Sequence, residues 1–388
     1  MKPTSKKRFL IFVHFGFLLV GIITVLLGQI LPILSKQLSL SDTEAGYFFI
    51  AQFSGSLLGV FLYNRGIKNF GFLKTLFAGF CLMAAGCLAL NADGFLTSFS
   101  AILIYGTGIG LTIPTTNMLI AELDPSRSTA NLSFLNFFWG AGAIASKPYV
   151  DFVGTVDSFF IPTVILSAAL FLVGVVICFS QNVTAGKIHE SPAVTDRSPI
   201  WKTPTAWLIA FFNFIQIGIE SSVGGWITTF ELRMAFVSPQ KWLSAALIFF
   251  LFMVIGRGIA PMIVPFLTEN ALLMINLLMM TAGVIVIFLS SEFFVLILGA
   301  GILGLGTSSV FPTNMSRFTK IFGPESTRRA TPVFVFGSIG GASMTWLVGY
   351  LSTAFGDLRS GFIAILIGCL ILIFLQFLIA RRSGRYYR

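Results

Sequence analysis

Long apolar segments separated by short polar connections run along almost the whole chain. Each segment is at least as long as the roughly 20 residues that an α-helix needs to cross the hydrocarbon of a bilayer. Leu272–Leu289 is apolar on every face, whereas the strands of a membrane barrel alternate apolar and polar residues. The pattern predicts twelve membrane-spanning helices, over residues 9–35, 44–64, 71–91, 95–122, 129–152, 156–180, 203–232, 240–266, 270–290, 292–318, 328–354 and 359–381.

Composition supports an integral membrane protein. Of the 388 residues, 56% are hydrophobic and 10% are charged, whereas roughly a quarter of a soluble domain is charged. The net charge of +10 raises the possibility of a nucleic-acid partner, but the basic residues gather at the ends of apolar segments and form no single stripe. We therefore expect the lipid bilayer as a partner and no nucleic acid. The four cysteines lie inside apolar segments, so neither a disulfide framework nor a zinc site is predicted.

The basic residues predict the topology. Nineteen, Arg317 among them, lie in alternate connections and in the two tails, and only four lie in the other connections. Because cytoplasmic loops are enriched in Lys and Arg, we expect both termini in the cytoplasm of a multi-pass protein of the inner, or plasma, membrane. Lys2, Lys6, Lys7 and Arg8 precede the first span, and further spans follow at once. This arrangement predicts an anchored first helix and no cleaved signal peptide.

A polar stretch near the middle of the chain predicts two halves. We expect a six-helix bundle over residues 1–182, a cytoplasmic linker over 183–202 and a second six-helix bundle over 203–388. IPTTNM at Ile113–Met118 is echoed by FPTNM at Phe311–Met315, and glycine clusters follow both. The echo indicates duplicated, pseudo-symmetric halves, an architecture in which the substrate site lies between the halves near the midplane.

Polar side chains within the spans are the candidates for function, because an unpaired polar group in hydrocarbon costs several kcal/mol. Glu220 is the strongest candidate, as a ligand-binding or proton-coupling carboxylate. The alternative is a buried ion pair or a protonated carboxyl that serves only helix packing. The amides match sugar hydroxyls in their donors and acceptors, and indoles offer an apolar face to a sugar ring. The predicted substrate-binding residues are Gln29, Asn117, Asn136, Trp139, Gln216, Glu220, Trp226 and Asn314. Hydrogen bonding between helices is the alternative for each amide.

Charged residues supply candidates for coupling or gating, which are Glu220, Arg257, Lys147 and Arg65. Arg257 is the expected partner of Glu220, with snorkelling to the cytoplasmic interface as the alternative. Lys147 and Asp151 lie one turn apart on a helix, which favours a local ion pair. His14 lies near the end of the first span, where an interfacial histidine is favoured over a proton relay.

Glycine-rich runs at Gly106–Gly110, Gly299–Gly306 and Gly337–Gly341 resemble nucleotide-binding loops only superficially. They lie inside apolar spans with no preceding strand, so they predict close helix packing. The chain lacks a Walker lysine and the motifs HExxH, GxSxG and CxxC. It is therefore not expected to be an enzyme or to hold a metal or cofactor.

Several strings resemble the major facilitator superfamily, and within it the fucose/galactose/glucose proton symporters and the related sodium-dependent glucose transporters. Gly106–Pro125 and Leu132–Ile144 are similar to the fourth and fifth helices of the fucose symporter. Gly218–Trp226, Gly256–Pro261 and Gly337–Gly361 are similar to the glucose branch. The resemblance implies an all-α integral membrane protein with the major facilitator fold.

Two positions depart from this family. Gln29 and Ile113 stand where the fucose symporter has acidic residues, whereas Asn117 matches its asparagine. The usual proton-coupling pair is therefore missing. The loop containing Arg65 and Lys68 keeps only part of the cytoplasmic gating signature. Coupling through Glu220, coupling to sodium and uniport all stay open.

We predict a secondary transporter that moves a small polar organic solute by alternating access, with a sugar as the favoured substrate and H⁺ or Na⁺ as a possible coupling ion. We expect it to be a monomer. An exporter of amphiphilic drugs or lipids is the alternative, favoured by the 43 phenylalanines. A receptor or assembly factor with this fold is disfavoured because the chain has no large soluble region or long tail, and an intramembrane enzyme is disfavoured for want of a nucleophile, base or metal cluster.

Overall fold

The computed structural model describes residues 3–123, 128–155, 157–180, 200–234, 240, 242–263, 266–323 and 329–383, and most of these residues are helical. They form two compact units. The first unit comprises Met1–Leu40 and Tyr47–Ser191, and the second comprises Ser41–Gly46 and Pro192–Arg388. Within the predicted linker, residues 183–199 lie outside the described residues, and a short 3-10 helix, η2, covers Ile200–Lys202.

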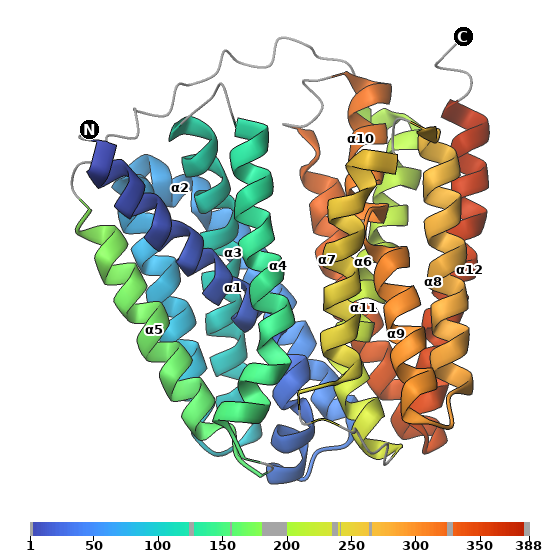
Figure 1. Ribbon diagram of the computed structural model, residues 1–388, viewed down its shortest axis with the longest axis horizontal. Helices are drawn as coiled ribbons and strands as arrows, with labels where there is room; N and C mark the ends of the chain where they lie inside the picture. The colour runs from blue at the N-terminus through green and yellow to red at the C-terminus, as the bar shows by residue number, and fades with distance from the viewer. Residues whose placement is uncertain are drawn as a thin grey trace. The chain divides into compact units, whose positions relative to one another are not determined.

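Five helices build the first unit (Figure 1, blue to green). They are α1 (Pro3–Gln37), α2 (Asp42–Ala89), α3 (Phe95–Leu123), α4 (Ser128–Val153) and α5 (Phe160–Cys178). Within this unit α1 packs against α4 and α5, and α3 packs against α4. Pro32, Pro114 and Pro148 lie inside α1, α3 and α4. Neighbouring helices in a membrane protein can compensate for the backbone hydrogen bonds that such prolines remove.

Helix α2 contains two of the predicted spans, 44–64 and 71–91. Its 48 residues correspond to about 72 Å of helix, more than twice the roughly 30 Å of the bilayer hydrocarbon. Gly71 interrupts it with φ 81° and ψ 170°, a conformation that disfavours any residue with a Cβ atom. The two passes therefore join at a glycine kink instead of a loop.

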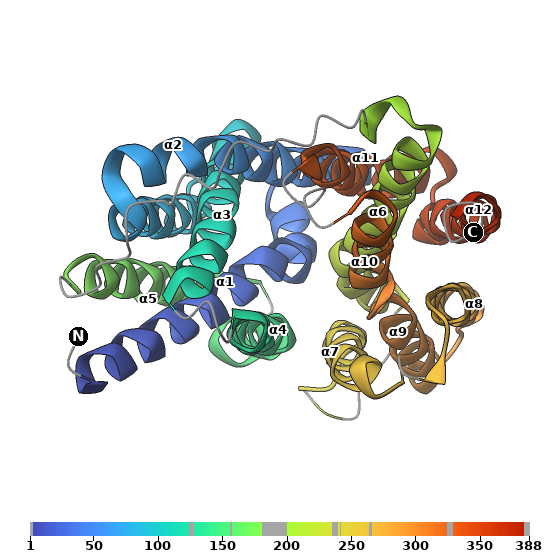
Figure 2. The ribbon, with the colours of Figure 1, turned by 90° about the horizontal axis from the view of Figure 1, so that it is seen from above.

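The second unit contains seven further helices (Figure 1, yellow-green to red). They are α6 (Pro204–Arg233), α7 (Ala245–Ile263), α8 (Glu269–Leu289), α9 (Phe293–Thr307), α10 (Val310–Phe322), α11 (Thr331–Phe355) and α12 (Leu358–Ser383). Helix α6 packs along α11 and α12, and α8 packs against α9 and α12. Helix α7 packs against α9, and Figure 2 shows this second unit end-on.

The predicted span 292–318 is broken into α9 and α10 at Ser308 and Ser309. The Ser308 hydroxyl donates to the Leu305 carbonyl at 2.6 Å, and the Thr307 hydroxyl donates to the Leu303 carbonyl at 3.1 Å. Such local hydroxyl bonds compete with the backbone hydrogen bonds that continue a helix. After this break, α10 continues to Phe322, beyond the predicted end of the span at residue 318. Arg317, which the sequence pattern assigned to a cytoplasmic connection, is instead 2% exposed inside α10.

Ten segments of the described chain are long and apolar enough to cross a membrane. The kinked α2 is one of these segments although it has the length of two passes, and α9 with α10 forms another. Helix α4 is not among the ten; it carries Asn136, Lys147 and Asp151, which lower its hydropathy. With the second pass of α2 and with α4, the helices account for the twelve predicted passes.

Glycines bring the helices close together, as their position inside apolar spans predicted. A Cβ atom on Gly110 of α3 would overlap the Ser56 carbonyl of α2, and one on Gly59 of α2 would overlap the Thr107 carbonyl of α3. In the second unit a Cβ atom on Gly340 of α11 would overlap the Phe214 carbonyl of α6. Small residues at these crossings let backbones approach to van der Waals distance, which is a main source of stability between membrane helices.

Gly110→Ala is expected to destabilise the protein by about 1–3 kcal/mol, because the added methyl group must push α3 away from α2. The measurement is the thermal unfolding midpoint of the purified protein in detergent. Gly258→Ala in α7 is the matched control, since its Cβ atom would meet nothing within 4 Å. An equal midpoint for the two variants would contradict tight packing at the α2–α3 crossing.

Candidate functional site

A row of polar side chains lies along one face of α6 in the second unit. Pro204 occupies the first turn of α6, where the missing N–H is not needed, and the helix continues to Arg233 without an interior proline. Asn213, Gln216 and Glu220 are spaced by three and four residues, so they project from the same side of this helix. Gln216 and Glu220 were predicted from the sequence, whereas Asn213 was not. Together they form the α6 polar face.

Glu220 lies between an amide and a cation. Gln216 Nε2 donates to Glu220 Oε2 at 2.9 Å, and Arg257 Nη2 of α7 lies 3.6 Å from Glu220 Oε1. The side chains of Glu220 and Arg257 are 18% and 34% exposed. An ion pair in an apolar setting offsets part of the cost of holding each charge there. The sequence-based pairing of Glu220 with Arg257 is therefore seen in the structure, and the alternative of a snorkelling Arg257 is not.

The end of α9 positions Arg257. Its Nε donates to the Ser308 carbonyl at 3.2 Å, at the break between α9 and α10. Gly256 permits this approach, because a Cβ atom there would overlap the Ser308 hydroxyl. Met253 Sδ lies 3.7 Å from Arg257 Nη2, one turn earlier on α7. The guanidinium is thus held on one side by protein and directed at Glu220 on the other.

Two acceptors on the α6 polar face are left without partners among the described residues. They are Asn213 Oδ1 and Gln216 Oε1, both buried. The Asn213 amide nitrogen is engaged, donating to the Val333 carbonyl at 2.8 Å. Buried polar atoms are nearly always hydrogen-bonded, so unpaired acceptors on one helix face indicate a place where a donor binds. Hydroxyl groups of a small molecule have the required chemistry.

Two other predicted binding residues of the second unit serve helix packing in this structure. Asn314 is fully buried, donates to the Ile209 carbonyl at 3.3 Å and accepts from Arg317 Nη2 at 2.6 Å. Trp226 is also fully buried, and its Nε1 donates to the Thr345 carbonyl at 2.9 Å. These bonds join α10 to α6 and α6 to α11. For Asn314 they correspond to the alternative of hydrogen bonding between helices.

Arg317 organises a buried network beyond Asn314. Its Nη1 donates to Gln376 Oε1 at 2.6 Å, and Gln376 Nε2 donates to Asn270 Oδ1 at 3.2 Å. The guanidinium also lies 5.3 Å from the centre of the Phe212 ring. The network links α10, α12, α8 and α6 through amides, a role that no sequence motif indicated.

The first unit holds the remaining predicted residues. Asn117 in α3 and Trp139 in α4 are partly buried, and Asn117 Oδ1 and Trp139 Nε1 are buried atoms without partners among the described residues. Gln29 is buried and its Nε2 lies 3.4 Å from the Val25 carbonyl. Asn136 is exposed and donates to the Leu132 carbonyl at 2.8 Å. Of these four, Asn117 and Trp139 have the unpaired groups that a ligand would satisfy.

The first unit contains a buried chain of hydrogen bonds that the sequence analysis did not predict. Tyr105 donates to Gln52 Oε1 at 3.2 Å, and Gln52 Nε2 donates to the Thr24 carbonyl at 2.8 Å. These bonds tie α3, α2 and α1 together. Because each group has a partner, we assign the chain to packing.

The other charged and titratable candidates have local roles in the structure. Lys147 pairs with Asp151 one turn away on α4, as their spacing predicted. Arg65 is exposed on α2 near the Gly71 kink. His14 Nδ1 donates to the Leu10 carbonyl at 2.6 Å, and the ring lies between Phe134 and Phe138. Among the described residues, no three His, Cys, Asp or Glu side chains are grouped so that they could hold a metal ion.

Ser41–Gly46, which include the first turn of α2, belong to the second unit, and within this unit Asp42 forms an ion pair that the sequence did not indicate. Arg233 donates to the Asp42 carboxylate through Nη1, at 2.6 Å, and through Nη2. The Ser352 hydroxyl also donates to this carboxylate. The Thr43 N–H donates to the Thr353 hydroxyl at 3.0 Å. Gly349 leaves room for the Asp42 backbone. These contacts explain why residues 41–46 group with the second unit.

Closely packed helices that are long and apolar enough to cross a membrane are the features of a polytopic membrane protein. The sequence profile of the Major Facilitator Superfamily matches residues 13–289, and the chain belongs to this superfamily. It is therefore a secondary transporter and not an enzyme, and the family resemblance seen in its motifs is confirmed.

Relatives and solved structures agree with this assignment. The chain is 23% identical over 354 residues to the glucose/mannose transporter GlcP of Bacillus subtilis, an alignment that covers 86% of this chain and 85% of that protein. A bacterial homologue of the human lysosomal transporter Spinster superposes with a TM-score of 0.80 at 14% identity, covering 98% of each chain. The nucleoside transporter NupG also gives 0.80 at 14% identity, covering 97% of this chain and 99% of that one. At such identities the structural likeness concerns the fold.

Proposed function

We propose that the protein transports a sugar by alternating access and that the α6 polar face, with Arg257, binds it. The observation that carries the proposal is a pair of unpaired buried acceptors on one face of α6: Gln216 Oε1, whose amide group is bonded to Glu220, and Asn213 Oδ1, one turn before Gln216. Sugars present several hydroxyl donors at spacings comparable to one helical turn, and charge-assisted bonds to a carboxylate are among the stronger ones. Within the first unit, Asn117 and Trp139 remain predicted substrate-binding residues, because Asn117 Oδ1 and Trp139 Nε1 are buried without partners among the described residues.

The distant relationship to a glucose/mannose transporter supports a hexose as the substrate. Structural similarity alone gives no preference, because a nucleoside transporter has the same fold. Glu220 is also the proposed coupling group, with H⁺ or Na⁺ as the coupling ion. We also propose a monomer located in the plasma membrane. The distribution of Lys and Arg supports placing both termini in the cytoplasm.

A ligand-induced thermal shift tests the proposed substrate class. The purified protein is heated with a panel of hexoses, amino acids, organic acids and amphiphilic dyes, with the pH and the Na⁺ concentration varied. A ligand present at about 100 times its Kd stabilises the folded state by about 2.7 kcal/mol, so a true substrate raises the unfolding midpoint measurably. Stabilisation by hexoses, absent in Gln216→Ala, is the expected result. Stabilisation by amphiphilic dyes alone would contradict a sugar substrate and support the exporter.

A further inference from the structure

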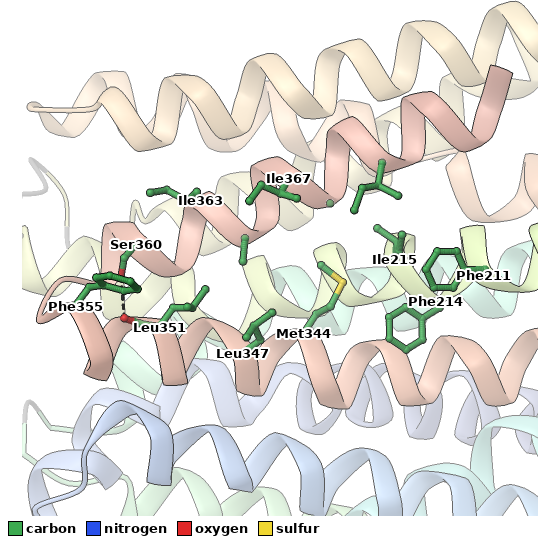
Figure 3. A pocket seen from close by; sticks show the side chains of 13 residues that line it. Phe211, Phe214, Ile215, Met344, Leu347, Leu351, Phe355, Ser360, Ile363 and Ile367 are labelled. Carbon is green, nitrogen blue, oxygen red and sulfur yellow. Dashed lines mark hydrogen bonds between the residues drawn. The ribbon is translucent and has the colours of Figure 1, made fainter. Parts of the chain in front are cut away.

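An apolar groove runs along the second unit between α11 and α12, with α6 at its base (Figure 3). It encloses about 660 Å³. The residues of α12 that line the groove recur at intervals of three or four positions, so they lie on one face of that helix. The lining residues of α11 do the same. The groove is lined by Phe211, Phe214, Ile215, Met344, Leu347, Leu351, Phe355, Ser360, Ile363, Ala364, Ile367, Gly368 and Ile371.

The lining offers nothing to a polar ligand. Ser360 is its one polar residue, and its hydroxyl lies 2.9 Å from the Leu351 carbonyl and 2.5 Å from the Asp357 carbonyl. No charged side chain lines the groove. A ligand that fits must therefore be hydrocarbon over its whole inserted length.

The length of the groove corresponds to one leaflet. Met344 to Phe355 on α11 and Ser360 to Ile371 on α12 each cover eleven residue steps, which is about 16 Å of helix and close to half of the roughly 30 Å hydrocarbon thickness. One end lies at the α11–α12 turn, where Gly356 ends α11 and Asp357 is exposed. The groove thus extends from a polar boundary toward the middle of the bilayer.

Small residues form the groove. Ala364 and Gly368 lie one turn apart on α12, where larger side chains would fill the space toward α11 and α6. A Cβ atom on Gly368 would already lie 3.1 Å from Met344 Cε. Ile363 and Ile367 are exposed, so the groove is open to the surrounding lipid along its side. All three helices, α6, α11 and α12, qualify as membrane spans.

We propose that this groove binds one acyl chain of a phospholipid from the leaflet on the side of the α11–α12 turn. Lipid tails already surround the protein, so affinity for the groove comes from the additional dispersion contacts that a recess gives to a chain. The bound tail fills the space between α11 and α12 and leaves its head group at the turn. The site is separate from the α6 polar face and independent of the proposed substrate.

Photolabelling tests the proposal. The full chain is reconstituted into vesicles of phosphatidylethanolamine and phosphatidylglycerol with a trace of phosphatidylcholine carrying a diazirine in mid-chain. After irradiation, labelled residues are located by peptide mass spectrometry. We expect labelling of groove residues such as Leu347 and Ile367 to exceed that of Leu370 and Phe374, exposed elsewhere on α12, by at least about five-fold.

Filling the groove supplies the matched test. Ala364→Trp is expected to abolish the excess labelling, whereas Leu370→Trp, on the exposed part of α12 outside the lining, leaves it unchanged. Even labelling of all exposed α12 residues in the wild type would overturn the proposal, and this result needs no variant to fold. Excess labelling that persists in a folded Ala364→Trp protein would overturn it as well.

Discussion

Glu220→Gln is expected to lower substrate uptake by about thirty-fold, since hydrogen bonds from a substrate to a charged group contribute about 1.5–3 kcal/mol and about 2 kcal/mol corresponds to that factor. The substitution keeps the size of the side chain but removes the negative charge that faces Arg257 Nη2 at 3.6 Å. It also changes the acceptor of Gln216 Nε2. The measurement is initial uptake of labelled substrate into proteoliposomes containing equal amounts of folded protein.

The control for charge removal is Glu292→Gln, because Glu292 is exposed at the start of α9 and its side chain accepts no capping hydrogen bond. It should transport as the wild type does. Glu220→Asp retains the charge at a greater distance from Arg257 and should lose less activity than Glu220→Gln. Wild-type uptake by Glu220→Gln would show that the carboxylate neither binds substrate nor couples an ion. Loss of uphill uptake with intact exchange would assign Glu220 to coupling alone.

Arg317→Met is expected to lower the thermal unfolding midpoint by roughly 5–15 °C. The change leaves two buried acceptors, Gln376 Oε1 and Asn314 Oδ1, without their guanidinium donor, at about 1–3 kcal/mol each. A thiol-reactive dye can follow unfolding, because Cys87 and Cys369 are buried in the folded protein. Arg317→Lys keeps the charge but cannot donate to both amides in the same fork, so an intermediate midpoint is expected.

Lys320→Met on the same helix is the matched control for Arg317→Met. Lys320 is about half exposed, and its ion pair with Glu269 at 2.7 Å lies at the protein surface. Exposed ion pairs contribute about 0–1 kcal/mol to the free energy of unfolding. The unfolding midpoint of Lys320→Met should therefore stay within roughly 2 °C of that of the wild type. If Arg317→Met unfolded at the wild-type temperature, the network around Arg317 would have no part in stability.

The sequence predicted the helices well because crossing a bilayer requires long apolar segments, a signal that does not depend on tertiary contacts. The glycine runs were also correctly assigned to packing, since Gly110 and Gly340 lie at the closest crossings. Glu220 and Arg257 were predicted as partners because charges within spans are rare and must be compensated. For the spans, the glycines and the charge pair alike, one strong physical constraint determines the structure.

Other features were beyond the sequence because hydropathy does not show whether a polar residue in or beside a span faces protein, lipid or water. For this reason Arg317 was predicted to be cytoplasmic, and Asn213 was not predicted as a site residue although it lies on the same face as Gln216. The Asp42–Arg233 pair joins residues 191 positions apart, and only tertiary structure reveals it. The break at Ser308 depends on local hydroxyl bonds that a hydropathy pattern does not record.

Counterflow in proteoliposomes is the most direct test of hexose transport through the α6 polar face. Vesicles loaded with unlabelled glucose or mannose are diluted into a trace of the labelled sugar, and no ion gradient is needed. The account predicts a transient accumulation of label with the wild type and little or none with Gln216→Ala. The absence of accumulation with any sugar, by a protein that extrudes amphiphilic dyes, would contradict it.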